Sequence, residues 1–317
     1  MAGYTALHES AAWIDISSRG RIRASGEDRQ GLLHAISSNA VEGLEPGQGV
    51  YAFFLNAQGR IQSDSRIFVA EDHVLIDCEP QARQTLLDHI NSYIIMDDVQ
   101  LEDAAEATAA IAVEGPRADE IVSRALGGIL PASEPYAHRE SLGTRVLRAS
   151  ISGQPGLWLI FSPGQKDELL KKLQAAGAEA GSEQDFRVVR VENRQPRFGE
   201  DYSSANIPHE TTLLHAVSFS KGCYLGQEIV ERVRARGQVN KLLVSLEFET
   251  RQPPQAETPV DHAGGDPAGK EAGRLTSPVF SPRRGKVLAF AILRREAAAQ
   301  GGEVTAGGVS GRVHAIA

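Results

Sequence analysis

The amino-acid sequence predicts an α+β protein with two ferredoxin-like α+β lobes and a small C-terminal β-barrel. Three observations lead to this fold class. Two successive segments repeat the order strand–helix–strand–strand–helix. After Lys241 the chain changes to short apolar strands separated by turns rich in glycine and proline, which is typical of a small barrel. Glycine accounts for 31 of the 317 residues, and this surplus favours many turns over long helical bundles.

These observations divide the chain into three expected domains. The N-terminal α+β lobe covers residues 1–103. The second α+β lobe covers residues 104–240 and includes the segment that carries the densest chemistry. The C-terminal barrel covers residues 241–317. A chain of this length can bury a sizeable core in each of two or three domains without disulfides.

Apolar and turn residues predict the elements of the first lobe. Asp28 is placed to cap a helix whose apolar positions Leu32, Leu33 and Ile36 lie on one face. The turn at residues 56–59 separates the continuous apolar run 50–55 from the segment 61–69 and predicts a β-hairpin. The expected elements are strand 21–24, a helix after residue 28, strands 50–55, 61–69 and 73–78, and a helix around 86–93.

The second lobe and the barrel follow from the same signals. Residues 194–220 hold two prolines and one asparagine and predict a long, mostly irregular connection, a kind of loop that is often functional. Residues 252–271 are polar and rich in proline and glycine, which predicts a flexible excursion. The expected elements are strand 111–113, helix 121–126, strands 145–151 and 157–161, helices 167–174 and 184–193, and barrel strands 242–248, 286–293 and 311–316.

The composition argues against several classes of function. A net charge of −8 and a pI near 5.7 are unfavourable for a broad nucleic-acid-binding surface. No run of 18 apolar residues occurs, so no membrane span is expected, and the N-terminus lacks the pattern of a secretory signal. Two distant cysteines, Cys78 and Cys223, argue against a disulfide framework and favour the cytoplasm. No metal-ligand motif is visible, so no metal site is predicted.

The segment Lys221–Glu228, which reads K-G-C-Y-L-G-Q-E, carries the densest chemistry in the sequence. Its two glycines allow a tight backbone, and its last two residues fall in the first turn of a helix. Cys223 lies just before that helix with Lys221 nearby, and a helix N-terminus and a cation both lower the pKa of a thiol. Cys223 is therefore a candidate nucleophilic or redox-active cysteine. The alternative is a buried cysteine in a packed turn.

Two carboxylates outside this segment each have more than one interpretation. Asp64 lies on a predicted strand and is exposed, paired with Arg60 or Arg66, or turned toward a cleft, because an isolated charge in a core is costly. Glu192 is either an ordinary helix carboxylate or an acceptor of two hydrogen bonds from a guanidine-like edge such as that of a pterin ring.

A group of basic residues follows the segment at 221–228. Arg232, Arg234 and Arg236 lie on the predicted helix, and Lys241 comes shortly after it. One interpretation is a solvated helix face, in which Glu228 pairs with the arginine four residues later. The other is a positive rim for an anion such as a phosphate or a polyglutamate tail.

The segment Lys221–Glu228 resembles the signature of YgfZ-type folate-binding proteins. These proteins belong to the glycine-cleavage T-protein superfamily and include mitochondrial iron–sulfur assembly relatives. The resemblance extends over roughly residues 15–317. Further matches in the family's order are Gly26 with the following helix, Asn56-x-x-Gly59-x-Ile61, Gly115-Pro116, Arg190-Val191-Glu192, Ile207-Pro208-His209-Glu210, and Ser277-Pro278 with Ser281-Pro282.

This resemblance implies a ligand and a set of site residues. The family's three domains surround a central channel that binds a reduced folate, so tetrahydrofolate or a derivative is the expected cofactor. Cys223 and Lys221 are expected to carry the chemistry. Phe186 stands where some members have a tryptophan near the folate. The implied folate-binding residues are Asn56, Asp64, Phe186, Arg190, Glu192, Gly222, Tyr224, Gly226, Gln227 and Glu228.

The resemblance also implies a function. The protein would assist the assembly or repair of iron–sulfur clusters in client enzymes that it contacts transiently, with tRNA modification as an associated process. The alternative is a folate-dependent aminomethyltransferase of the T-protein type or another one-carbon transferase, and a scaffold with a vestigial channel is a third reading. Two departures count against aminomethyl transfer. The stretch Gly59–Asp64 holds one aspartate where the T-protein has a pair, and the T-protein lacks the cysteine motif.

Overall fold

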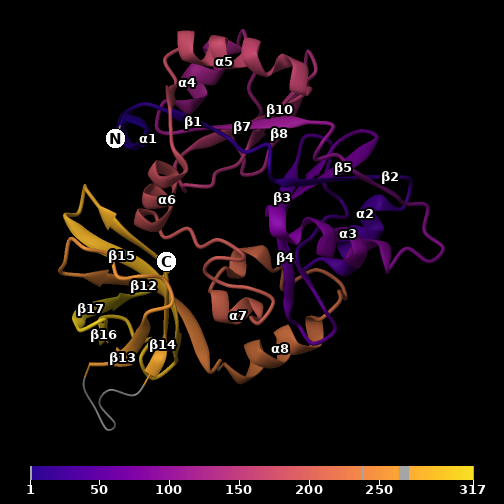
Figure 1. Cartoon of the computed structure of the whole chain (residues 1–317). Helices are drawn as coiled ribbons and strands as arrows, with labels where there is room; N and C mark the ends of the chain where they lie inside the picture. Colours follow the sequence, from indigo (N-terminus) through magenta and orange to yellow (C-terminus); the bar gives the residue numbers. More distant parts are fainter. Residues whose placement is uncertain (1, 238, 264–270, 317) are drawn as a thin grey trace.

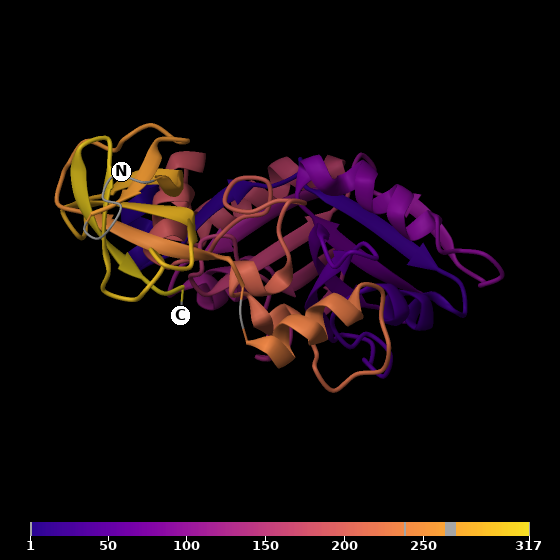
Figure 2. The same ribbon diagram turned by 90° about the horizontal axis from the view of Figure 1, so that it is seen from below.

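The computed structural model describes residues 2–237, 239–263 and 271–316. It contains two α+β lobes and a closed barrel, which confirms the predicted fold class. In Figure 1 the two lobes and the barrel lie around the middle of the molecule, with short helices between the barrel and the first lobe. Figure 2 shows the barrel at one end of the molecule and helix α8 (Gln227–Arg236) on the lower side of the first lobe.

The first lobe is an antiparallel sheet covered by two helices. Its elements are β2 (Gly20–Ser25), α2 (Arg29–Ile36), β3 (Gly49–Leu55), β4 (Ile61–Val69), β5 (His73–Cys78), the 3-10 turn η1 (Pro80–Ala82), α3 (Arg83–Asn91) and β6 (Gln100–Asp103). The strand order is β3-β4-β5-β2-β6, and β3 and β4 form the predicted hairpin. Apolar side chains of α2 and α3, including Leu33 and Ile90, join the strands in one buried cluster.

Asp28 precedes helix α2 but does not cap it with its side chain. The helix has no side-chain cap bond, and Asp28 Oδ2 instead accepts the backbone N–H of Asp98 at 2.8 Å. The expected cap was therefore wrong. The carboxylate ties the start of α2 to the loop before β6, a contact between residues 70 positions apart that local sequence does not encode.

The second lobe is built on a mixed sheet. Its elements are α1 (Ala2–Glu9), β1 (Ala12–Asp15), β7 (Ala109–Glu114), α4 (Ala118–Ala125), β8 (His138–Ser141), β9 (Thr144–Arg148), β10 (Gly156–Phe161), η2 (Pro163–Gln165), α5 (Lys166–Ala175) and β11 (Glu179–Ala180). The strand order is β11-β1-β7-β10-β9-β8. Strand β1 pairs with β7, so the first residues of the chain complete the sheet of the second lobe. The expected strand at 145–151 ends at Arg148.

The connection between the second lobe and the barrel contains more structure than the sequence predicts. It comprises α6 (Glu183–Glu192), α7 (Pro208–Thr211), η3 (Leu214–Ala216) and α8. Residues 194–220 were expected to be mostly irregular, and α7 and η3 are short elements within them. Glu210 closes the first turn of α7, because its Oε2 accepts the N–H of Ile207 at 3.2 Å and the side-chain amide of Asn206 at 3.1 Å.

The barrel closes because its first strand pairs with its last. Its strands are β12 (Lys241–Phe248), β13 (Pro259–His262), β14 (Glu271–Ser281), β15 (Lys286–Arg294), β16 (Glu303–Ala306) and β17 (Val309–His314). The order is β12-β15-β14-β13-β16-β17, closed by pairing of β12 with β17. The three predicted barrel strands are confirmed. The excursion expected at 252–271 was wrong in part, because β13 lies within it and pairs with β14 and β16; residues 264–270 lie outside the described residues.

In the part of the chain that the structure describes, none of the helices has the length and apolar character needed to cross a membrane.

Candidate functional site

A cavity of about 670 Å³ lies between the two lobes, and we call it the Asp64 cavity. Its walls come from strands β3 and β4, from loops of the second lobe and from the segment after α6. Cavities of a few hundred Å³ with a small number of polar groups are typical of small-molecule sites. The lining includes Tyr51, Asp64, Arg66, Glu79, Tyr136, Arg197 and His215.

A second cavity of about 630 Å³ lies beside the first, and we call it the Phe186 cavity. Ile151, Arg190 and Arg197 line both cavities, so the two share a wall. The rest of the lining of the Phe186 cavity comes from β1 and the residues just after it, from the first half of α6, including Phe186 and Arg187, and from Glu200.

The side chain of Asp64 is the clearest chemical feature of the Asp64 cavity. Its Oδ2 accepts hydrogen bonds from the hydroxyls of Tyr51 at 2.6 Å and Tyr202 at 3.0 Å. Its Oδ1 is buried and has no partner within the described residues. Burial raises the pKa of both tyrosines well above 10, so their hydroxyls remain donors. Of the alternatives left open by the sequence, Asp64 faces the cleft, whereas Arg60 donates to the backbone carbonyl of Ala205.

Glu79 and its partners set the electrostatics behind Asp64. Arg19 pairs with Glu79 at 2.5 Å and Arg197 pairs with it at 2.8 Å. Although burial acts in the opposite direction, these two guanidinium groups lower the pKa of Glu79 to about 2. Burial first, and the negative charge of Glu79 second, raise the pKa of the Asp64 carboxyl. Asp64 therefore holds its proton more tightly than an ordinary aspartate, which suits a group that hydrogen-bonds to a ligand or exchanges a proton with it.

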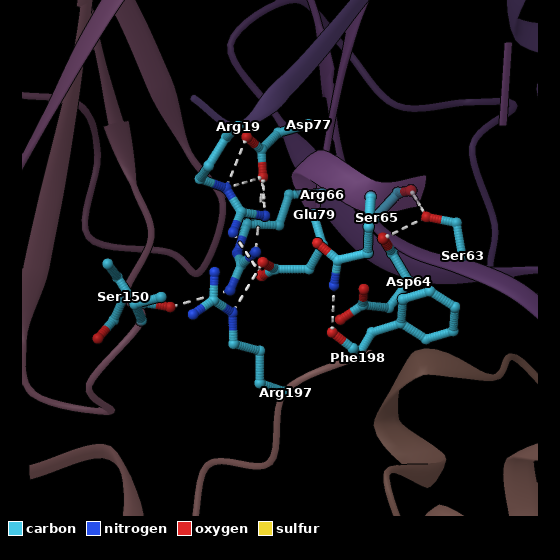
Figure 3. Close-up of polar contacts among 12 residues, drawn as sticks. Arg19, Ser63, Asp64, Ser65, Arg66, Asp77, Glu79, Ser150, Arg197 and Phe198 are labelled. Carbon is cyan, nitrogen blue, oxygen red and sulfur yellow. Dashed lines mark hydrogen bonds and ion pairs between the residues drawn. The ribbon is translucent and has the colours of Figure 1, made fainter. Parts of the chain in front are cut away.

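Figure 3 shows these carboxylates and guanidinium groups side by side. Asp77 accepts from Arg19 at 2.6 Å and lies 3.6 Å from Arg66, so it extends the ion-pair network along the edge of the sheet. Arg66 also donates to the backbone carbonyl of Ser150 in the second lobe at 2.9 Å. Because most of its members are buried, the network fixes the wall of the cavity rigidly.

Arg190 lies where both cavities meet, but protein groups use most of its donors. Its guanidinium pairs with Asp201 at 2.5 Å and Glu200 at 2.9 Å, and it donates to Ser277 Oγ at 2.7 Å and to the carbonyl of Gln195 at 2.8 Å. Ser277 belongs to strand β14, so Arg190 connects α6 to the barrel. The structure thus places Arg190 beside the cavities, mainly as a link between domains.

Glu192 does not line either cavity, contrary to its expected role in ligand binding. Its Oε1 accepts from the hydroxyls of Tyr4 at 2.7 Å and Ser281 at 2.5 Å, and its Oε2 lies 2.9 Å from His8 Nε2. Both oxygens are thus engaged by helix α1 and the barrel. From the sequence, this carboxylate was a candidate to accept hydrogen bonds from a guanidine-like edge of a ligand. In the structure it links helix α6, helix α1 and the barrel.

Two other predicted ligand-binding residues, Asn56 and Phe186, lie outside the Asp64 cavity. Asn56 Oδ1 accepts the N–H groups of Gln58 and Arg60, at 3.0 and 2.9 Å, and so holds the turn between β3 and β4. It does not line the Asp64 cavity. Phe186 is buried in a cluster with residues of α1, including Leu7, and its ring borders the Phe186 cavity.

Cys223 is exposed, in a loop just before α8. The alternative of a buried cysteine in a packed turn is therefore wrong for this residue. Cys78, by contrast, is buried at the end of β5, and burial raises the pKa of its thiol. Among the described residues, no group of three or more histidine, cysteine, aspartate or glutamate side chains is arranged to hold a metal ion.

Lys221 anchors this loop through its ammonium group. The Nζ atom donates to the backbone carbonyls of His34, of Ser37 at 2.7 Å and of Asn39 at 3.0 Å, all at the end of helix α2. Burial lowers the pKa of Lys221 to about 8. Lys221 therefore positions the loop through three carbonyl groups, and its expected role beside the thiol stays a prediction.

The two glycines of the loop differ. Gly226 has φ +79°, and a Cβ placed on it would lie 2.6 Å from the carbonyl oxygen of Asn56. The loop therefore docks closely on the turn between β3 and β4, the same hairpin that carries Asp64. Gly222 has open space around it, so of the two glycines Gly226 makes the close backbone approach.

The remaining residues of the segment serve the loop or face solvent. Tyr224 is buried, with its ring 5.0 Å from Lys221 Nζ, and burial raises its pKa to about 12. Gln227 Oε1 accepts the N–H of Tyr224 at 3.0 Å, and Glu228 is exposed and pairs with Arg232 at 2.5 Å. The last pairing confirms the solvated-face interpretation for these two residues. None of residues 221–228 lines either cavity.

The residues that shape the Asp64 cavity and that sequence reasoning missed include Tyr51, Glu79, Tyr136 and Tyr202. Tyr51 and Asp64 lie on paired strands, so their common face could have been found from the hairpin register. Tyr202 comes from a connection with no periodic pattern, and its position is a product of tertiary packing.

Comparisons with known proteins agree with this architecture. The family model described as "GCVT N-terminal domain" matches residues 2–221, and the one described as "Glycine cleavage T-protein C-terminal barrel domain" matches residues 241–316. The chain is 27% identical to "Putative transferase At1g60990, chloroplastic" of Arabidopsis thaliana, over 93% of this chain and 68% of that protein. It is also 27% identical to an aminomethyltransferase of Rubrobacter xylanophilus, over 93% and 80% of the two chains.

A solved structure shares the whole fold. The crystal structure of the glycine cleavage system aminomethyltransferase T from Bartonella henselae superposes with a TM-score of 0.89 at 20% identity. The match covers 99% of this chain and 88% of that one. At this identity the likeness speaks for the fold alone.

Proposed function

The chain belongs to the glycine cleavage T-protein family, and we propose that it is a YgfZ-type, tetrahydrofolate-binding member that supports iron–sulfur clusters in other enzymes. In this proposal a reduced folate occupies the Asp64 cavity, and Cys223 acts at the surface during assembly or repair of a client's cluster. The clients bind transiently, and the protein works in the cytoplasm. The family supplies a folate-dependent transferase fold, and the finer assignment is ours.

The observation that carries the proposal is the placement of Cys223. Its thiol is exposed on a loop that is fixed at both ends, by the three carbonyl contacts of Lys221 and by the close approach of Gly226 to Asn56. A rigid loop that presents one exposed thiol is suited to a partner protein, because a thiol on a flexible loop would lose more freedom on docking. The segment also contains the eight residues that resemble the YgfZ signature.

The Asp64 cavity supports the folate part of the proposal. Its volume is in the range of small-molecule sites, and it combines stacked aromatic rings with one free carboxyl oxygen. A pterin ring presents a flat face and N–H donors at its edge, which match these two features. Arginines at the shared wall, such as Arg197, would favour the carboxylates of the folate tail.

An aminomethyltransferase activity is the second candidate. It is favoured by the names of the relatives and by Asp64, a buried carboxyl with a raised pKa in a cavity. It is disfavoured because the stretch Gly59–Asp64 holds one aspartate where the T-protein has a pair. The residue before Asp64 is Ser63, which points to the opposite face of the strand and donates to a backbone carbonyl.

Two measurements on the purified protein test the proposal. Calorimetric titration with 5-formyltetrahydrofolate should give a saturable signal at micromolar protein, and its absence would contradict the folate assignment. Incubation with an aminomethyl-loaded lipoyl carrier protein and tetrahydrofolate should release no ammonia at an enzymatic rate. Robust turnover in that assay would replace the proposal by the second candidate.

A further inference from the structure

A groove of about 290 Å³ lies between helix α7, the turn η3 and helix α8, and we call it the α8 groove. Figure 2 shows α8 on the lower side of the molecule. Four of the side chains that line the groove are apolar: Leu214, Phe219, Val233 and Val239. Leu214 is one of four large apolar side chains that are exposed within the described residues. An exposed leucine on the wall of an apolar groove is typical of a surface that a partner covers.

Basic residues give the α8 groove a positive edge. From Arg232 to Lys241 the sequence holds four basic residues and no acidic one, although the whole chain has a net charge of −8. Arg234 lines the groove, and its guanidinium lies 4.4 Å from the centre of the Phe219 ring, which holds it in place. Its ion pair with Glu231 joins one guanidinium nitrogen at 3.5 Å, so other N–H donors remain for a further carboxylate.

His209 adds a polar group to the wall of the α8 groove. Both of its ring nitrogens are shielded from solvent and have no hydrogen-bond partner within the described residues. Burial lowers the pKa of this ring, so at neutral pH it holds one N–H donor and one acceptor. A buried polar atom without a partner costs free energy, and the backbone of an extended peptide offers an N–H and a C=O that would satisfy both nitrogens.

The α8 groove is continuous with the segment that holds Cys223. Phe219 comes two residues before Lys221 in the chain, and Arg234 belongs to the helix that begins just after the thiol. Helix α8 has ten residues and is therefore about 15 Å long. A protein segment held in the groove would thus place the rest of that protein within reach of Cys223.

We propose that the α8 groove binds an extended segment of a client protein, in which an apolar side chain is followed by acidic residues. This inference rests on the proposed function and names the surface through which a client reaches Cys223. The apolar side chain fills the groove, the backbone of the segment meets the ring nitrogens of His209, and the carboxylates pair with Arg234. The basic residues of α8 line neither the Asp64 cavity nor the Phe186 cavity, so a bound folate does not account for them.

An acidic protein segment fits the α8 groove better than a nucleic acid or a lipid surface does. A nucleic acid needs a broad basic face, whereas α8 also carries Glu228 and Glu231 and the chain as a whole is acidic. A lipid surface is bound by a wide apolar helix face, whereas the apolar surface here is one small groove.

Peptide binding tests the α8 groove directly. The probe is a fluorescein-labelled peptide of sequence DELLFDED, and two comparison peptides replace either its three apolar residues by serine or its acidic residues by lysine. Fluorescence polarisation should show saturable binding of the probe at micromolar concentration, weakened by salt, and each comparison peptide should bind at least tenfold more weakly. No binding of the probe, or equal binding of the three peptides, would overturn the inference. So would binding of a single-stranded RNA or of anionic lipid vesicles in place of the probe.

Two variants and a matched control locate the bound peptide. Leu214→Ser and Arg234→Glu change exposed side chains, so both should keep the melting temperature while binding the probe at least tenfold more weakly. Arg124 is similarly exposed and also pairs with a glutamate of its own helix, α4, but it lies outside the groove. Arg124→Glu should therefore bind the probe within about twofold of the unchanged protein. If Leu214→Ser and Arg234→Glu bind it equally well, the groove is not the docking site.

A measurement in cells separates this inference from the proposed function. In cells that lack the protein, Arg124→Glu should restore the activity of iron–sulfur enzymes and Arg234→Glu should restore much less, with the same alkylation rate of Cys223 in both purified variants. If Arg234→Glu restores the enzymes fully, the docking role is wrong and the proposed function stands. If the unchanged protein restores none of them, the proposed function fails, and probe binding that Arg234→Glu weakens would still support the groove as a docking site.

Discussion

The hydroxyl of Tyr51 donates a 2.6 Å hydrogen bond to Oδ2 of Asp64, and the hydroxyl of Tyr202 donates to the same oxygen at 3.0 Å. Because both donors use one oxygen, Oδ1 keeps its capacity to accept a hydrogen bond from the cavity side. Tyr51 comes from strand β3 and Tyr202 from the connection after α6. The carboxyl is thus clamped by segments that are distant in the sequence, and its orientation is fixed before a ligand arrives.

Asp64 should lower stability at neutral pH. Its pKa is raised in the folded protein, so the folded state binds the proton more tightly than the unfolded chain, and stability falls as the pH rises through the folded pKa. Asp64→Asn removes this loss of unfolding free energy, and the asparagine oxygen can still accept the hydrogen bonds from both tyrosine hydroxyls. Urea unfolding should show the variant to be more stable at pH 7, with the gain disappearing below about pH 4. A variant that is less stable at pH 7 would contradict the assignment.

The same substitution, Asp64→Asn, should weaken the binding of the folate. A hydrogen bond from a ligand N–H to a carboxylate contributes about 1.5–3 kcal/mol, so the affinity of Asp64→Asn for 5-formyltetrahydrofolate should fall about tenfold or more. Asp72 provides the control, because it is exposed and lies outside the Asp64 cavity. If Asp64→Asn and Asp72→Asn bind this folate equally well, Asp64 is not a ligand contact.

Glu79 should make the protein sensitive to acid. Arg19 and Arg197 lower its pKa from 4.5 to about 2 against the effect of burial. This stabilisation, about 3 kcal/mol, is present above the unfolded pKa and is lost as the pH falls from about 4.5 to about 2. Glu79→Gln leaves Arg19 short of a buried partner and should cost about 3–5 kcal/mol at pH 7. The free energy of unfolding of both proteins is measured as a function of pH. If it falls equally steeply below pH 4.5 in the unchanged protein and in Glu79→Gln, the prediction is wrong.

Gly226 and Gly222 form a matched pair of glycines in one loop. A methyl group on Gly226 would approach the Asn56 carbonyl to 2.6 Å at φ +79°, whereas Gly222 has open space around it. Gly226→Ala should therefore destabilise the protein by about 1–3 kcal/mol, and Gly222→Ala should have little effect. Thermal unfolding of the two variants side by side checks this. Equal melting temperatures would mean that the loop does not dock on the hairpin.

The sequence was sufficient for the features that local patterns encode. The hairpin of β3 and β4 was predicted from the apolar run 50–55 and the glycine-containing turn after it, and the start of α8 from Gln227 and Glu228. The partners of charged side chains were not predictable in this way. Glu192 accepts a hydrogen bond from Tyr4, which lies 188 positions earlier in the chain, and no sequence periodicity predicts such a contact. Its carboxylate was therefore assigned to a ligand when the protein itself satisfies it.

Strand β13 shows the same limit in the fold. The segment 252–271 around it is polar and rich in proline and glycine, which indicates a loop, and only pairing with β14 and β16 makes residues 259–262 a strand. For Lys221, the sequence suggested a charge near the thiol, but the carbonyl groups that engage it belong to the end of helix α2, more than 180 positions earlier.

The two cysteines should react at very different rates. Cys223 is exposed, whereas Cys78 is buried and burial raises the pKa of its thiol. A time course of alkylation by iodoacetamide at neutral pH, followed by peptide mass spectrometry, should modify Cys223 first and Cys78 only when the protein unfolds. Comparable rates in the folded protein would mean that the first lobe opens readily.

The central claim is that Cys223 serves the iron–sulfur clusters of other enzymes. The direct test is the activity of iron–sulfur enzymes in cells that lack this protein and are supplied with the unchanged chain, with Cys223→Ser or with Cys78→Ala. Cys223→Ser should leave the melting temperature unchanged, because the residue is exposed, but it should fail to restore the enzymes. Cys78→Ala should restore them at equal protein level. Full restoration by Cys223→Ser would contradict the account.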